Sequence, residues 1–162
     1  MSDSRIPVFS ADDQRSGARG AMLGGAIATI AGLWLPLFTL TAGARPTAPS
    51  RSMWDLHQSG TPGFPLFVLG AVLLIMGSFI PAHLEALGVR GWLAGVAVAV
   101  GIGILLAISI GYSTALTNYS AMSSSSVSHA TFHYGLLVLV AGPAAAVVGS
   151  WQLWVADARS SG

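Results

Sequence analysis

Four long apolar runs alternate with polar segments along the chain. They cover residues 20–41, 64–81, 91–112 and 133–155. Each run holds about 20 residues, which is the length that an α-helix needs to cross the hydrocarbon core of a bilayer. A backbone in lipid has to satisfy its own hydrogen bonds, so each run is expected to be helical. The pattern therefore predicts an all-α integral membrane protein, built as a four-transmembrane-helix bundle.

The polar segments complete the predicted organisation. Residues 1–19 form an amino-terminal tail, and residues 156–162 form a carboxy-terminal tail. Two longer loops cover 42–63 and 113–132, and a short turn joins the second and third runs. The transmembrane domain then extends over 20–155. The first apolar run is longer than the apolar core of a secretory signal, so we expect it to be retained as a helix.

The placement of arginine predicts the orientation of the bundle. All seven basic residues are Arg. Five of them lie in the two tails and the middle turn, and two lie in the longer loops. Arginine accumulates on the cytoplasmic side of membrane proteins. We therefore expect both termini to be cytoplasmic and both longer loops to face outward, in a multi-pass protein of the inner (plasma) membrane.

Composition agrees with lipid as the solvent and excludes several functions. The chain is 53% hydrophobic and 8% charged, whereas about a quarter of a soluble domain is charged. It has no Cys, which excludes disulfides, thiolate metal sites and thiol nucleophiles. A net charge of +1 without a basic stripe argues against nucleic acid as a partner. The use of Arg without Lys, with abundant Ala and Gly, indicates a GC-rich genome such as that of an actinobacterium.

Small residues recur at every fourth position of the third run. Because small residues let helix backbones approach closely in lipid, this row predicts a helix-packing interface. A row of this spacing winds around a straight helix. Its lower and upper halves should therefore face different neighbours, and this helix should be the most enclosed. The bulkier second run should face lipid more. The predicted interface residues are Gly91, Gly95, Ala99, Gly103, Ala107 and Gly111, together with Gly24 and Gly32 from a similar row in the first run.

Two interpretations of these rows remain open. They hold the four helices together, or they leave one small-residue face for a partner protein. Pro143, in the middle of the fourth run, removes a backbone hydrogen bond and is expected to bend that helix. Such a bend either serves packing or lines the path of a ligand.

The first outer loop contains the segment Trp54, Asp55 and Leu56. Its apolar side chains alternate with polar neighbours, as in a short strand or a loop on the membrane surface. The segment is either a lid over the bundle or a docking patch for a partner, because exposed aromatic residues anchor protein interfaces.

The expected chemistry is sparse. No ionisable residue lies deep in any apolar run, and such residues usually mark ion paths and substrate sites in membrane proteins. We therefore expect no catalytic residue, cofactor or metal. One alternative is an outer metal site in which His129 and His133 share a helix face and His57 or Asp55 completes the ligand set.

Two short motifs support a resemblance to known membrane proteins. Gly32-Leu33-Trp34 before a long outer loop resembles the claudin-like four-helix layout, without the Cys pair of the claudin loop. Trp34-Leu35-Pro36 followed by Ser52-Met53-Trp54-Asp55 resembles small four-helix actinobacterial membrane proteins, some of which are accessory subunits of envelope complexes.

The resemblance implies a non-catalytic accessory or assembly subunit of a larger integral membrane protein complex. A Mce-type lipid-transport complex is the first candidate host, and a respiratory supercomplex is the second. A stand-alone small transporter or lipid-binding protein is the remaining alternative. Membrane lipids are expected partners in each case.

Overall fold

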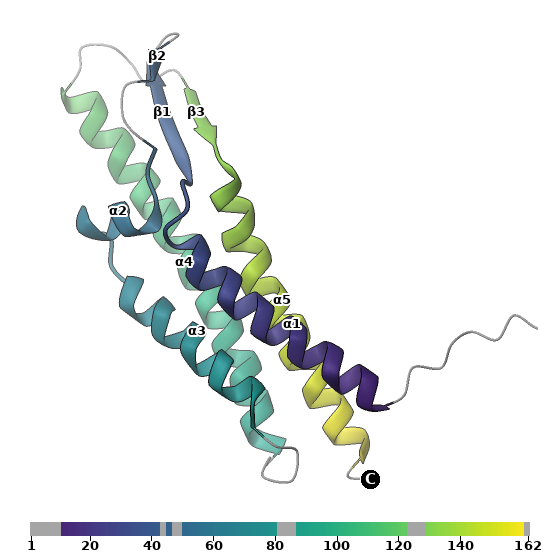
Figure 1. The fold of residues 1–162 in the computed structure, drawn as a ribbon. Coiled ribbons are helices and arrows are strands. Elements are labelled where there is room, and N and C mark those ends of the chain that lie inside the picture. The colour runs from purple at the N-terminus through teal and green to yellow at the C-terminus, as the bar shows by residue number, and fades with distance from the viewer. Residues whose placement is uncertain (1–10, 43–44, 47–49, 81–86, 123–128, 161–162) are drawn as a thin grey trace, which may run out of the picture.

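A computed structural model describes residues 11–42, 45–46, 50–80, 87–122 and 129–160. Within them the fold is mostly helical, as the apolar pattern predicts. Among the described residues, four long helices run along the molecule, three short strands gather at one end, and α1 begins near the end of α5 at the other (Figure 1). The elements in chain order are α1 (Ala11–Gly32), β1 (Phe38–Ala42), β2 (Arg45–Pro46), α2 (Met53–Gln58), α3 (Phe64–Ser78), α4 (Leu87–Met122), β3 (His129–Phe132) and α5 (Tyr134–Ser160).

Two helices of the described residues are long and apolar enough to cross a membrane. They are Val89–Asn118 within α4 and Tyr134–Arg159 within α5. The helix α3 is also apolar but shorter, at 15 residues. These lengths and compositions support a helical membrane protein.

The first helix lies earlier in the chain than predicted. It covers 11–32 instead of 20–41. Pro36 lacks a backbone N–H and disfavours helical geometry in the residue before it, so the helix ends upstream. Phe38–Ala42 then forms strand β1. At the other end, residues 11–19 are helical instead of tail-like, with two Asp residues in the first turn, where they interact favourably with the helix dipole.

A small antiparallel sheet replaces parts of the predicted outer loops. Its strand order is β2-β1-β3, and Phe38 pairs with Phe132 at one end of the β1–β3 ladder. The helix α4 extends beyond the predicted boundary at 112 and ends at Met122. It continues because Tyr112, Ala115 and Leu116 pack against the core beneath the sheet. The prediction of a loop is therefore wrong for 113–122 and 129–132, and residues 123–128 lie outside the described residues.

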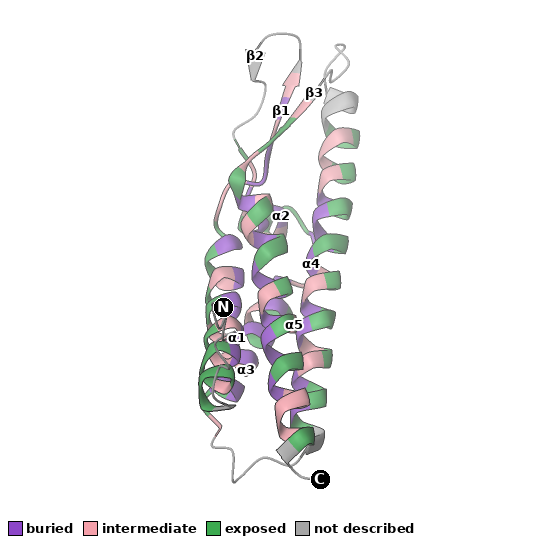
Figure 2. Ribbon diagram, turned by 90° about the vertical axis from the view of Figure 1, so that its right-hand side faces the viewer, coloured by how far each residue is buried: buried purple, intermediate pink, exposed green. Residues whose placement is uncertain are grey.

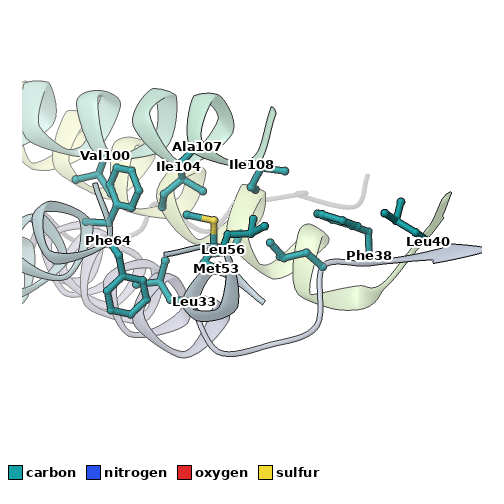
Figure 3. Packing of buried hydrophobic residues seen from close by; sticks show 13 residues of the cluster. Leu33, Phe38, Leu40, Met53, Leu56, Phe64, Val100, Ile104, Ala107 and Ile108 are labelled. Carbon is teal, nitrogen blue, oxygen red and sulfur yellow. The ribbon is translucent and has the colours of Figure 1, made fainter. Parts of the chain in front are cut away.

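The apolar core has two parts. The first extends from beneath the sheet into the bundle and contains Phe38 of β1, Met53 of α2 and Ile104 of α4 (Figure 3). The second lies toward the opposite end and joins α1, α3, α4 and α5 through Met22, Leu74, Leu93, Leu153 and smaller residues. Together they join all the long helices into one packed unit.

The helices α1 and α5 approach each other backbone to backbone. A Cβ on Gly25 would lie 2.5 Å from the backbone nitrogen of Ala146, and one on Gly149 would lie 2.6 Å from the carbonyl oxygen of Ala18. The contacts repeat at seven-residue intervals, because Ala18, Gly25 and Gly32 of α1 meet an α5 row containing Gly142 and Gly149. A seven-residue repeat keeps one seam facing a partner helix along its length. The pair α1–α5 is therefore the packing centre of the molecule.

The prediction that 91–112 forms the most enclosed helix is wrong. Within its most apolar window 33% of α4 is buried, compared with 39% of α5. Exposed residues follow the outward face of α4 along its described length (Figure 2). The shorter α3 buries seven of its 15 residues while exposing Leu66 and Met76, so it does not stand out as the lipid-facing helix.

Candidate functional site

The predicted row of small residues on α4 divides into two halves. In the upper half, a Cβ on Gly103 would lie 2.7 Å from Cε1 of Phe67, and one on Gly111 would lie 2.7 Å from Cδ1 of Leu56. Ala107 between them is buried. Gly103 thus faces α3, and Gly111 faces α2. The upper half thus packs within the chain, and the two halves do meet different surroundings.

The lower half of the row faces away from the bundle. Gly91, Gly95 and Ala99 are exposed, and a Cβ on Gly95 would meet no heavy atom within 4 Å. At roughly 100° per residue, these three positions lie within an arc of about 80°. The same arc contains five further exposed residues, Ile102, Leu106, Ser109, Ser113 and Thr117. We call these eight residues the open stripe of α4.

The hydroxyl groups at the upper end of the open stripe are satisfied within the helix. Ser109 donates a hydrogen bond of 2.9 Å to the carbonyl oxygen of Leu105. Ser113 and Thr117 repeat this bond one and two turns later, each at 2.9 Å. Each hydroxyl oxygen keeps lone pairs that can accept a bond from outside. The stripe therefore combines small residues, apolar residues and acceptors on one exposed helix face.

The two glycines predicted on α1 differ in their surroundings. A Cβ on Gly32 would lie 2.9 Å from Cδ2 of Leu139, so Gly32 packs against α5. A Cβ on Gly24 would meet nothing within 4 Å. Within the described chain, Gly32 belongs to the α1–α5 contact and Gly24 does not.

The segment around Trp54 forms the short helix α2, which is neither of the predicted conformations. It lies beside the end of α1, where the backbone N–H of Trp54 bonds to the carbonyl oxygen of Leu33, and it also contacts α3 and α4. Leu56 is 3% exposed and packs on Gly111. Trp54 remains exposed and stacks at 6.4 Å on Trp34. Of the three predicted docking residues, only Trp54 presents a large exposed surface.

Asp55 has a structural role at the start of α2. Its Oδ2 accepts a hydrogen bond of 2.8 Å from the backbone N–H of Ser52, whose Oγ accepts a bond of 3.2 Å from the N–H of Asp55. This reciprocal capping box satisfies two donors that a helix start otherwise leaves unpaired. The carboxylate is therefore engaged within the chain.

Replacing Asp55 by Ala should lower the free energy of unfolding by about 1 kcal/mol, because capping residues contribute roughly that much. Thermal unfolding of the purified protein in detergent measures the change. Gln58→Ala, at an exposed position of the same short helix, is the control and should have little effect. Equal losses for the two variants would contradict a capping role for Asp55.

The histidines of the predicted metal site each have contacts of their own. His129 lies in β3 opposite Thr41. The prediction that His129 and His133 share a helix face is therefore wrong. The Nε2 of His133 lies 2.8 Å from Oγ1 of Thr39. His57 stacks on Phe64 at 5.4 Å. Within the described part of the chain, no three His, Asp or Glu residues are grouped so that they could hold a metal ion.

Charged side chains gather at the end opposite the sheet. Arg90, which the sequence suggests lies in a turn, belongs to α4 and is 1% exposed. Its Nε lies 3.3 Å from Oδ2 of Asp157 in α5. The Nη2 of Arg15 in α1 lies 3.7 Å from Oδ1 of the same carboxylate. Asp157 thus connects three helices, and residues 156–160 belong to α5 rather than to a separate tail.

A groove of about 750 Å³ lies beside this cluster, between the start of α1 and the end of α5. Its residues are Gln14, Arg15, Gly17 and Ala18 of α1 with Trp151, Gln152, Val155, Ala156 and Arg159 of α5. Sequence reasoning missed it, because no local motif brings these two ends of the chain together. The ligand path predicted at the Pro143 bend would lie elsewhere on α5. Pro143 is buried, and its Cβ lies 3.2 Å from the position that a Cβ on Gly101 would take.

Comparison of the chain with models of protein families, with curated proteins and with solved structures finds no match.

Proposed function

We propose that α1, α3, α4 and α5 all cross the plasma membrane, with both termini on the cytoplasmic side. The apolar lengths of α4 and α5 and the composition of α3 support this placement. Arg15, Arg90 and Arg159 lie at one end of the bundle, and arginine is enriched on the cytoplasmic side. The sheet and α2 then face outward.

In this placement the protein is a non-catalytic accessory or assembly subunit that docks on a larger integral membrane protein. The open stripe of α4 carries the proposal. Glycine weakens a helix relative to alanine, and its use in a transmembrane helix favours close approach of another helix backbone. Among the described residues, a Cβ on Gly95 would meet no heavy atom within 4 Å, and one on Gly91 would meet only the side chain of Trp154, at 4.0 Å. A transmembrane helix of the partner is the occupant that fits the stripe.

An envelope complex is the proposed host. The resemblance of Trp34-Leu35-Pro36 and Ser52-Met53-Trp54-Asp55 to small actinobacterial accessory subunits supports a host of this class, and a Mce-type lipid-transport complex is the first candidate. A respiratory supercomplex is the alternative host. The exposed Trp54 adds an aromatic contact on the outer side.

Purification of the tagged full chain from its native membrane in mild detergent tests the proposal. We expect one large membrane protein to be recovered in stoichiometric amount. Gly95→Leu should reduce its recovery at least about tenfold, because a leucine would hold the partner helix away from the stripe. The stability of the chain itself should stay unchanged, since a Cβ at Gly95 meets nothing within 4 Å.

Gly24→Leu is the matched control. It makes the same substitution at a glycine of α1 that is equally open, and it should leave recovery unchanged. Recovery of only a monomer or a homo-oligomer would contradict the accessory function. Loss of the partner with Gly24→Leu but not with Gly95→Leu would exclude the stripe of α4 as the docking face.

A further inference from the structure

The groove between α1 and α5 combines basic and apolar surfaces. Arg15 and Arg159 supply two positive charges, and Gln14 and Gln152 supply amide donors. Trp151, Val155 and Ala156 supply apolar surface along α5. No acidic side chain is among the described residues that form the groove. This arrangement suits a ligand with an anionic group joined to a hydrocarbon part.

We infer that this groove binds the phosphate headgroup of an anionic phospholipid in the cytoplasmic leaflet. The inference rests on the proposed membrane placement. Basic pockets between transmembrane helices on the cytoplasmic side are suited to such headgroups. The volume of about 750 Å³ lies in the range of small-molecule sites, about 300–1,000 Å³.

The two arginines contribute differently. Arg15 is held near Asp157 at 3.7 Å with its side chain 30% exposed, and a guanidinium has five donors, so it can bind a phosphate as well. Arg159 is exposed, whereas Arg15 and Arg90 each lie within ion-pair distance of Asp157. Arg159 is therefore the residue whose charge the ligand would use most directly.

The groove is open on the side of α1 because the residues of α1 that border it include small ones. A Cβ on Gly17 would meet nothing within 4 Å, which leaves space above this turn of the helix. On the other side, Trp151 is more than half exposed. Trp151 precedes Arg159 by two turns of α5, a rise of about 12 Å. A phospholipid with its headgroup at the arginine end can thus place its acyl chains along the indole of Trp151. Trp is favoured at this level of the membrane interface.

The test uses the purified full chain alone in nanodiscs, so it does not depend on recovery of a partner. Nanodiscs contain phosphatidylcholine with or without phosphatidylglycerol, and native mass spectrometry measures phosphatidylglycerol retained by the chain. We expect selective retention by the wild type. Arg159→Gln should weaken it about fivefold, the effect of one basic residue near an anionic surface. Arg159→Lys should keep most of the retention.

Arg51→Gln is the matched control, because it removes the same charge close to the sheet at the other end of the molecule. It should leave retention unchanged, and an equal loss with this variant would overturn the site. Unchanged retention with Arg159→Gln would also overturn it. A chain that fails to enter nanodiscs at all would instead contradict the membrane placement on which both proposals rest.

Inorganic phosphate distinguishes a lipid from a soluble anion. We expect phosphate to stabilise the protein only weakly in detergent, and Trp151→Ala to reduce retention of phosphatidylglycerol because the acyl chains lose their contact. Stabilisation by phosphate that equals the effect of the lipid, with no response to Trp151→Ala, would overturn the lipid assignment in favour of a phosphate site.

Discussion

Replacing Gly25 by Leu should lower the free energy of unfolding by about 3 kcal/mol, the upper end of typical overpacking costs. The added Cβ would lie 2.5 Å from the nitrogen of Ala146 and 2.5 Å from the carbonyl oxygen of Gly142. Both atoms belong to the α5 backbone, which cannot move aside as a flexible side chain can. The helices α1 and α5 would have to separate along the seam that joins them.

Thermal unfolding in detergent should then show a midpoint lower by about 6–12 °C, given a shift of roughly 2–4 °C per kcal/mol for a chain of this size. Gly24→Leu is the adjacent control, since its Cβ would meet nothing within 4 Å. Its effect should stay within about 0.5 kcal/mol, as for most surface substitutions. A larger loss for Gly24→Leu than for Gly25→Leu would reverse the assignment of the packed face.

Replacing Asp157 by Ala should cost about 3 kcal/mol of unfolding free energy, because removing one partner leaves a buried charge without compensation. The side chain of Arg90 is only 2% exposed, and that of Asp157 is 15% exposed. Without the carboxylate, the buried guanidinium loses an ion pair and α1 loses its link through Arg15. Thermal or denaturant unfolding of the variant in detergent measures the loss.

Asp12→Ala is the control for this variant, because Asp12 is an exposed acid in the first turn of α1. It should cost about 0.5 kcal/mol through the helix dipole. The double variant Arg90→Met with Asp157→Leu should regain most of the stability, since an apolar pair can replace a buried ion pair. If the loss of unfolding free energy in the double variant equalled the sum of the losses in Arg90→Met and Asp157→Leu alone, Arg90 and Asp157 would act independently.

The packing seam shows how far spacing alone predicts a membrane fold. A row with one small residue in every four was evident in α4, and its upper part, Gly103 to Gly111, does pack within the chain. The seam between α1 and α5 instead uses a seven-residue repeat, Ala18, Gly25 and Gly32. The four-residue row predicted in the first run, with Gly24 and Gly32, shares only Gly32 with this repeat. Composition cannot decide between a four-residue and a seven-residue repeat, because the repeat that packs depends on the direction and crossing angle of the partner helix.

The outer elements were harder to predict for a different reason. Pro36 marks the end of the first helix, but apolar content alone extended the predicted helix to residue 41. The capping pattern of Ser52 and Asp55 is readable in the sequence as a helix start.

The groove could not be predicted from the sequence, because Arg15 and Arg159 come from opposite ends of the chain. It depends on the antiparallel contact of α1 with α5, which no local pattern contains.

The shortness of α3 has a consequence for the surrounding bilayer. Its 15 residues span about 23 Å, whereas the hydrocarbon core is about 30 Å thick. In the proposed placement, lipids beside α3 must shorten or tilt to keep their chains against apolar surface, since a short span thins the bilayer next to it. On this side the protein would deform the membrane, and it would be sorted toward thinner bilayers or toward a neighbour that covers α3.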